Sequence, residues 1–220
     1  MQFPNAHKGI GQIFRAEILT LIATILSIIA LASAFIGYAA EKAEAASDAA
    51  IGGFALGAGG LAVVAGILAI IAFVLTILSI NNASKDEDSF RKAMLWLILG
   101  IVGSAAQSFG QAGETVQLIG SLLTSLGSML STYYVIFGII KLADRKHNQQ
   151  VSAKGGRIIK MILGIYVLSL ILTIINGFFG GSNSAVTVGG ILGIVALILM
   201  IVAYILYLTL LSQARKMLEH

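Results

Sequence analysis

The chain has 220 residues, of which 58% are hydrophobic and only 11% are charged. Soluble domains carry about 25% charged residues, and a soluble protein this apolar would lack the polar groups to cover its surface, so the composition predicts an integral membrane protein. The absence of cysteine excludes disulfides, thiol catalysis and Cys-based metal sites. The net charge of +4 follows from membrane topology, so no nucleic-acid partner is predicted.

Six apolar runs are long enough to cross a hydrocarbon core of about 30 Å, which requires about 20 helical residues. They cover residues 18–40, 54–80, 93–109, 116–143, 161–179 and 186–211. The predicted fold class is therefore all-α, a polytopic membrane bundle of six transmembrane helices in one domain over residues 1–217. The last residues, 218–220, resemble the remnant of an expression tag.

The segment before the first run, residues 1–17, is predicted to be a separate helix at the membrane interface. Asn5 is the expected cap of this helix. Ile10, Ile13 and Phe14 are expected to lie on lipid, while Lys8 and Arg15 reach the headgroups.

Pairs of glycines at G-x-x-x-G spacing occur near the outer ends of the second and sixth runs. They are Gly53 with Gly57, and Gly189 with Gly193. Glycines at this spacing let two helices approach closely. They predict tight packing against a neighbouring helix and are weaker evidence for dimerisation.

Three acidic residues, Asp86, Glu87 and Asp88, follow Ser84 between the second and third runs. In one interpretation their oxygens bind a divalent cation loosely. In the other, Ser84 caps a helix whose N-terminal dipole favours the acids. We favour the helix start, because the spacing lacks the pattern of a calcium loop.

The fourth run carries the most informative pattern. Gly120, Thr124, Ser128 and Thr132 recur every four residues and so share one helix face. Either the small side chains allow close approach of another helix, with hydroxyls bonding to backbone across the interface, or the face lines a path for water or a neutral solute. We favour packing, because it is the commoner use of such a face.

Amide side chains lie near the outer ends of the third and fifth runs. Gln107, Gln111 and Asn176 are candidates to bond between helices or to form a shallow outer pocket. The third run is the shortest, and it becomes polar at Gln107. Residues 147–156 (HNQQVSAKGG) are predicted to form a flexible cytoplasmic linker.

Positive charge separates across the six predicted spans. Of the 14 Lys and Arg residues, only Lys42 falls on one side, and the other 13 fall on the side that holds both termini. The positive-inside rule therefore predicts a multi-pass protein of the cell membrane with both termini in the cytoplasm. The spans form three successive hairpins, of about residues 1–84, 85–150 and 151–217.

No catalytic, cofactor-binding or metal-binding residues are predicted. No Asp, Glu, Lys, Arg or His lies deep in a predicted span, which argues against proton pumps and ion-coupled carriers. We therefore predict a non-enzymatic bundle of bacterial character that acts through lipid, a membrane-protein partner or self-assembly as a homo-oligomer. The alternative is a channel or carrier for a small neutral solute or lipid.

Overall fold

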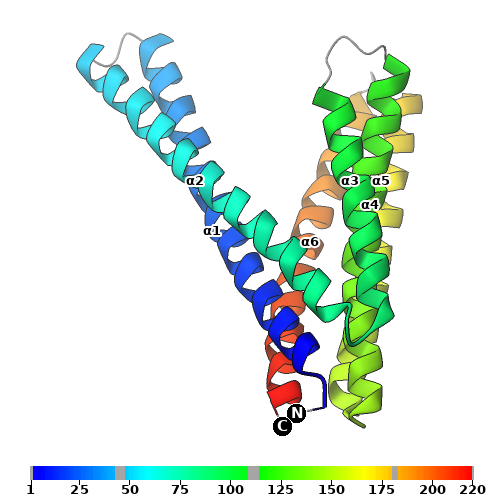
Figure 1. Ribbon diagram of the computed structural model, residues 1–220. Coiled ribbons are helices and arrows are strands. Elements are labelled where there is room, and N and C mark those ends of the chain that lie inside the picture. The colour runs from blue at the N-terminus through cyan, green and yellow to red at the C-terminus, as the bar shows by residue number, and fades with distance from the viewer. Residues whose placement is uncertain (1, 43–47, 109–113, 180–182, 220) are drawn as a thin grey trace. The chain divides into compact units, whose positions relative to one another are not determined.

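The computed structural model describes residues 2–42, 48–108, 114–179 and 183–219, and within these ranges every regular element is an α-helix. The predicted all-α fold class is confirmed (Figure 1). The six helices are α1 (Pro4–Lys42), α2 (Asp48–Ala83), α3 (Asp88–Ser108), α4 (Glu114–Arg145), α5 (Gln149–Phe179) and α6 (Asn183–Glu219).

Five of the helices carry a stretch that is long and apolar enough to cross a membrane, counted over the described residues. These stretches belong to α1, α2, α3, α4 and α6. Side chains 169–194 are not described, and they include residues 169–179 at the end of α5. The predicted span in α5 therefore stays a prediction.

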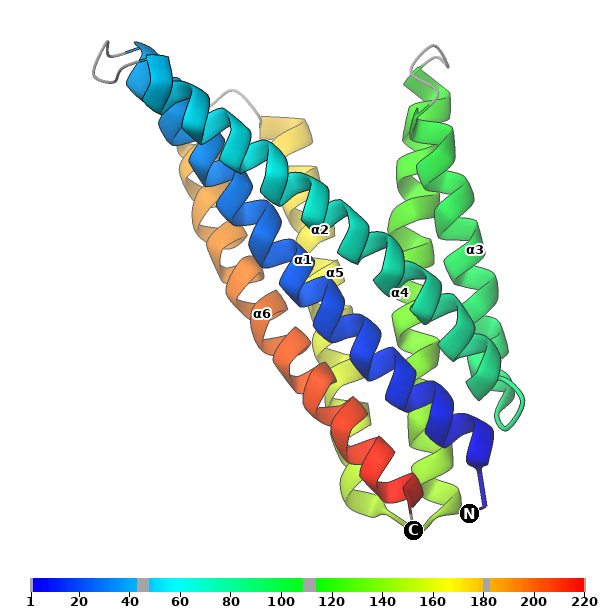
Figure 2. The same ribbon diagram turned by 60° about the vertical axis from the view of Figure 1, so that its left-hand side comes forward.

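The chain divides into two compact units. Unit 1 comprises Met1–Ile10 and Ile80–His220, and unit 2 comprises Gly11–Ser79. Unit 1 thus contains the start of α1, the end of α2 and all of α3 to α6, whereas unit 2 holds the greater part of α1 and α2 (Figure 2). The prediction of one domain over residues 1–217 stays a prediction.

Unit 2 is an antiparallel helix pair (Figures 1 and 2). Alanines recur among its buried side chains along both helices. Ala23 and Ala30 of α1 are buried, and so are Ala58, Ala65 and Ala72 of α2, each seven residues from the next on its helix. A small residue at every seventh position keeps one seam facing the neighbouring helix and lets the axes approach closely, as in left-handed coiled coils. The other faces expose large aliphatic side chains, as expected for a surface in contact with lipid.

The core of unit 1 lies at the end of its helices that holds both chain termini. Side chains less than 2% exposed gather there from the end of α2 and from α3 to α6: Ile80, Phe90, Ile136, Ile139, Leu142, Ile158, Leu210, Leu211 and Leu218. The Phe90 ring fills the space beside Gly138, where an added Cβ would lie 2.7 Å from Cε2 of that ring. Glycine at position 138 is therefore required for α4 to accept the ring.

The flexible linker predicted for residues 147–156 is wrong, because α5 already begins at Gln149. His147 adopts a positive φ of 54°, and the Asn148 N–H donates to Ala143 O at 2.8 Å, which closes α4 in a Schellman turn. The Asn148 side chain then caps α5 by accepting from the Val151 N–H at 3.1 Å. The polar residues that were predicted to form a linker instead end α4 and cap α5.

The separate interfacial helix predicted for residues 1–17 is also wrong. α1 is continuous from Pro4 to Lys42, and Ile10 and Ile13 are 0% and 1% exposed rather than lipid-facing. Asn5 does not cap the helix. Instead, Asp86 Oδ2 accepts a hydrogen bond from the Ala6 N–H at 2.7 Å, and Asn5 Nδ2 donates to Asp86 Oδ1 at 2.9 Å. A distant carboxylate thus satisfies a first-turn amide that has no partner in its own helix.

Asp86→Ala is expected to lower the free energy of unfolding by about 0.5–2 kcal/mol, the usual cost of losing an N-cap side chain. Amide hydrogen exchange in the first turn of α1 should rise, because the Ala6 N–H loses its acceptor. Asp144→Ala removes the same charge from an exposed position of α4 and should leave exchange there unchanged. Similar exchange in both variants would contradict the cap.

Candidate functional site

The seam between α3 and α4 brings glycine backbones into direct contact. An added Cβ on Gly103 would lie 2.7 Å from Gly120 O, and one on Gly127 would lie 2.6 Å from Gly100 Cα. Both neighbours are backbone atoms, which cannot turn aside as a side chain can. Only glycine fits at positions 103 and 127 without separating the helices.

The Thr124 hydroxyl lies in the same seam. It donates to Gly120 O at 2.9 Å, lies 3.4 Å from Gly100 O and accepts from Gln107 Nε2 at 2.8 Å. Three predicted residues, Gln107, Gly120 and Thr124, are therefore brought together at the helix contact. Ser128 is exposed instead. Thr132 is half-buried and donates to Ser128 O within its own helix at 3.1 Å.

The remaining predicted residues are not brought to this seam. Gln111 lies outside the described residues, as do the surroundings of Asn176, Gly189 and Gly193. At Gly53 and Gly57 an added Cβ would meet no described atom within 4 Å. Tight packing at these two glycines stays a prediction, and it would need a contact outside the described chain.

Sequence reasoning missed Gly100 and Gly103, and it placed Gly127 beside the predicted face of α4 without identifying it as a contact residue. The signal that could have found two of them is a seven-residue spacing of small residues. Gly100 follows Ala93 by seven positions, and Gly127 follows Gly120 by the same interval. This is the interval that places residues on one seam of a supercoiled helix pair.

A buried carboxylate, Glu87, joins the turn before α3 to the end of α4. Its side chain is 1% exposed, with Oε1 3.2 Å from Lys141 Nζ and Oε2 2.6 Å from Arg145 Nη2. The Arg145 contact is an ion pair without hydrogen-bond alignment. The Ser89 hydroxyl donates to Oε1 at 2.9 Å. The predicted helix start at the acidic residues is confirmed, but Glu87 caps it rather than Ser84.

Glu87 is held in its charged form. Burial by itself raises the pKa of this carboxyl, but hydrogen bonds from Ser89 and Lys141, and the charge of Arg145, outweigh it. The net result is a pKa below the ordinary value of 4.5. An ionised carboxylate engaged by two cations is a structural clamp, since it has no proton to give near neutral pH.

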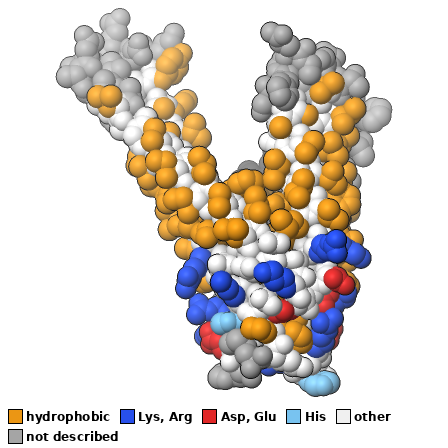
Figure 3. All heavy atoms as spheres, viewed as in Figure 1, with side chains coloured by type: hydrophobic (Ala, Val, Ile, Leu, Met, Phe, Trp, Pro, Cys, Tyr) orange, Lys and Arg blue, Asp and Glu red, His pale blue; other side chains and the backbone are white. Residues whose placement is uncertain are grey.

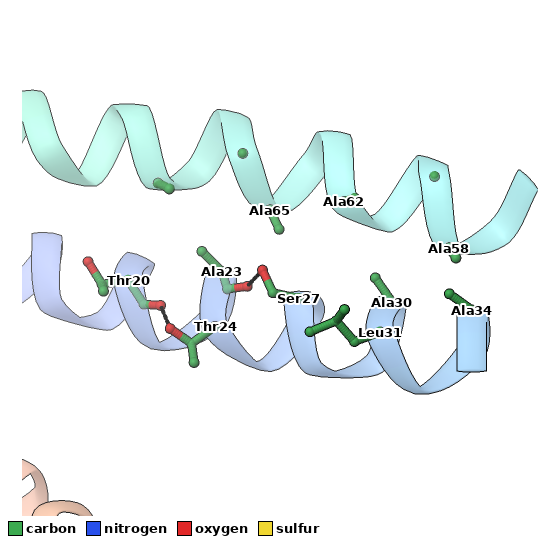
Figure 4. Close-up of a pocket in the computed structure, with 13 residues that line it drawn as sticks. Thr20, Ala23, Thr24, Ser27, Ala30, Leu31, Ala34, Ala58, Ala62 and Ala65 are labelled. Carbon is green, nitrogen blue, oxygen red and sulfur yellow. Dashed lines mark hydrogen bonds between the residues drawn. The ribbon is translucent and has the colours of Figure 1, made fainter. Parts of the chain in front are cut away.

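A groove of about 630 Å³ lies on the helix pair of unit 2 (Figure 4). Small side chains of α2, such as Ala58, Ala62 and Ala65, line it together with hydroxyl residues of α1. Thr24 donates to Thr20 O at 2.8 Å, and Thr20 and Ser27 likewise donate four residues back along α1. The hydroxyl protons are thus already engaged, so the groove offers shape rather than donors.

The long helices expose apolar side chains along most of their length, and charged side chains gather at the end of unit 1 that holds both termini (Figure 3). Among the described residues, no three His, Asp or Glu side chains come together as a metal site would require. These features define an α-helical multi-pass membrane protein. No family model, curated protein or solved structure matches the chain.

Proposed function

We propose that the protein is a non-enzymatic membrane bundle that works through contacts of its helices, with a second copy or with another membrane protein, and through lipid. The observation that carries the proposal is the small-residue groove of unit 2. In a bilayer, helices associate by close packing rather than by a hydrophobic driving force. A groove walled by alanine and glycine is where an added helix gains the most packing contact.

The chemistry of the described side chains also favours a non-enzymatic role. The carboxylate that is buried at the basic end, Glu87, is engaged by Lys141 and Arg145. The Ser89 hydroxyl donates to Glu87, but the lowered pKa of that carboxyl makes it a weak base. The hydroxyls in the groove bond to their own helix. These side chains hold the helices together rather than carry out a reaction.

The membrane and orientation form part of the same proposal. The end of unit 1 that holds both termini carries most of the Lys and Arg residues of the chain. The positive-inside rule therefore favours a cell-membrane protein with both termini in the cytoplasm.

The experiment uses the natural absence of cysteine, so that one introduced thiol reports one position. Ala62→Cys places the thiol in the groove, and Ile67→Cys places it on an exposed face of α2 outside the groove lining. Oxidation or a short bifunctional maleimide in native membranes should give a discrete dimer or heteromeric product from Ala62→Cys and little from Ile67→Cys. Monomer alone from both variants, or equal products from both, would remove the support for the proposal.

The alternative is a channel or carrier for a small neutral solute or lipid. It was predicted from the face of α4 that carries Thr124, Ser128 and Thr132, together with Gln107 and Asn176. Thr124 lies against α3, so a path would have to follow the Ser128 side. A solute flux in proteoliposomes that Ser128→Leu abolishes would favour this alternative over the proposal.

A further inference from the structure

Aromatic and cationic side chains meet on the α3–α4 pair where its apolar part gives way to charge. Lys92 Nζ lies 5.8 Å from the ring centroid of Tyr134. Tyr133 packs edge-on against that ring at 5.2 Å and stacks on Phe137 at 5.9 Å. Tyrosine rings, and lysines whose stems lie along apolar surface, are the side chains that favour the membrane–water interface.

The same border is repeated on α5. Lys92 stands three residues before Leu95, the first exposed large hydrophobic residue of α3, and Lys160 stands three residues before Leu163, its counterpart on α5. Three helical residues rise about 4.5 Å, so each ammonium group lies about one headgroup layer from the start of the apolar surface. The lysines therefore stand at the depth of lipid phosphates.

The cations at this end of unit 1 differ in their partners. Lys141 and Arg145 are engaged by Glu87. Lys92 is exposed and forms no ion pair within the described residues, although Asp88 lies one turn away on α3. Its ammonium group is left with an aromatic face on one side and with its charge uncompensated. A phospholipid headgroup whose net charge is negative complements this arrangement.

We propose that Lys92, together with Tyr133 and Tyr134, binds the headgroup of an anionic phospholipid in the leaflet on the basic side. The lysine supplies the charge and the two tyrosines supply an apolar wall for the glycerol region. A zwitterionic lipid is a poorer ligand, because its own ammonium group is repelled by Lys92 and by the neighbouring Arg91. This site adds one lipid partner to the proposed function, and it rests on that function for the presence of a bilayer.

The test uses the one tryptophan of the chain, Trp96, as the reporter. Trp96 follows Lys92 by four residues and so lies on the same face of α3. The full chain is placed in phosphatidylcholine nanodiscs that contain a small fraction of lipid brominated near the headgroup end of its acyl chains. Bromine quenches indole fluorescence at contact, so quenching reports which lipid occupies the site.

Brominated phosphatidylglycerol is expected to occupy the site with about fivefold preference over brominated phosphatidylcholine, the factor for one lysine near an anionic lipid. Lys92→Gln should bring the ratio close to one, Lys92→Arg should retain it and Tyr134→Leu should lower it. The matched control, Lys216→Gln, removes the same charge from an exposed position on α6 and should keep the ratio.

Three results would overturn the proposal: equal quenching by the two lipids, a preference that survives Lys92→Gln, or a preference lost equally in Lys216→Gln. The last would show attraction to the whole basic end rather than binding at Lys92. Helix content by circular dichroism identifies a variant that fails to fold, and Lys92→Arg then decides the charge requirement. Crosslinking at Ala62 reads helix contacts in unit 2, so its failure is distinguishable from failure of the lipid site.

Discussion

Gly127→Ala is expected to lower the free energy of unfolding by about 1–3 kcal/mol, the usual cost of overpacking a close contact. The new methyl would lie 2.6 Å from Gly100 Cα and 2.7 Å from Trp96 O. Neither backbone atom can rotate away, so α3 and α4 must separate. Separation also weakens the contact between Thr124 and Gly100 O across the seam.

The matched control is Gly164→Ala on α5. Gly164 lies in the span predicted over residues 161–179, and an added Cβ there meets no described atom within 4 Å. Because alanine is a better helix former than glycine, this variant should be neutral or gain up to about 1 kcal/mol. Both are measured by titrating the folded protein in mild detergent with dodecyl sulfate. Equal effects at positions 127 and 164 would show that the α3–α4 seam does not depend on glycine.

Glu87→Gln is expected to cost roughly 2 kcal/mol of stability at neutral pH. Removing one partner of a fully buried ion pair costs about 3–5 kcal/mol. That figure is reduced here because the Lys141 and Arg145 side chains are 43% and 50% exposed, so water can solvate their charges once Glu87 is neutral. What remains is the loss of two charge-assisted contacts at a carboxylate that is itself buried.

The effect of Glu87→Gln has a defined pH dependence. The folded pKa of Glu87 is lowered from 4.5, so the folded state binds the proton less readily than the unfolded state. The stabilisation by Glu87 is therefore fully present above 4.5 and is lost as the pH falls through the lower folded value. The difference in unfolding free energy between the natural chain and Glu87→Gln should be constant near neutrality and shrink in acid. A difference that grows in acid would contradict the ionised clamp.

Identical sequence motifs in this chain have different packing. Residues 98–101 and 162–165 both have the sequence Ile-Leu-Gly-Ile. A Cβ added at Gly100 would lie 3.5 Å from Gly127 Cα, whereas one added at Gly164 would meet no described atom within 4 Å. A short match among Gly, Ile and Leu therefore does not indicate which glycine lies at a helix contact.

The sequence by itself determined the class of protein, because the cost of moving about 20 apolar residues out of lipid is large and adds along the chain without reference to any partner. The uneven distribution of Lys and Arg along the chain is likewise visible in the sequence, because it depends on no tertiary contact. The full lengths of α1 and α5 could not be predicted without the tertiary structure. Residues predicted to form an interfacial helix or a linker are buried in these helices, as Ile10 and Val151 show.

Only the tertiary structure decided which small and charged residues form contacts. The α1 cap comes from Asp86, 80 positions from Ala6, and no local pattern connects them. The clamp at Glu87 needs the end of α4, which lies 54 positions away at Lys141. Of the four residues in the α4 stripe, α3 covers Gly120 and Thr124 and leaves Ser128 exposed, because the register of the two helices is set by where their glycine backbones meet. That register depends on both helices together and could not be predicted from either helix alone.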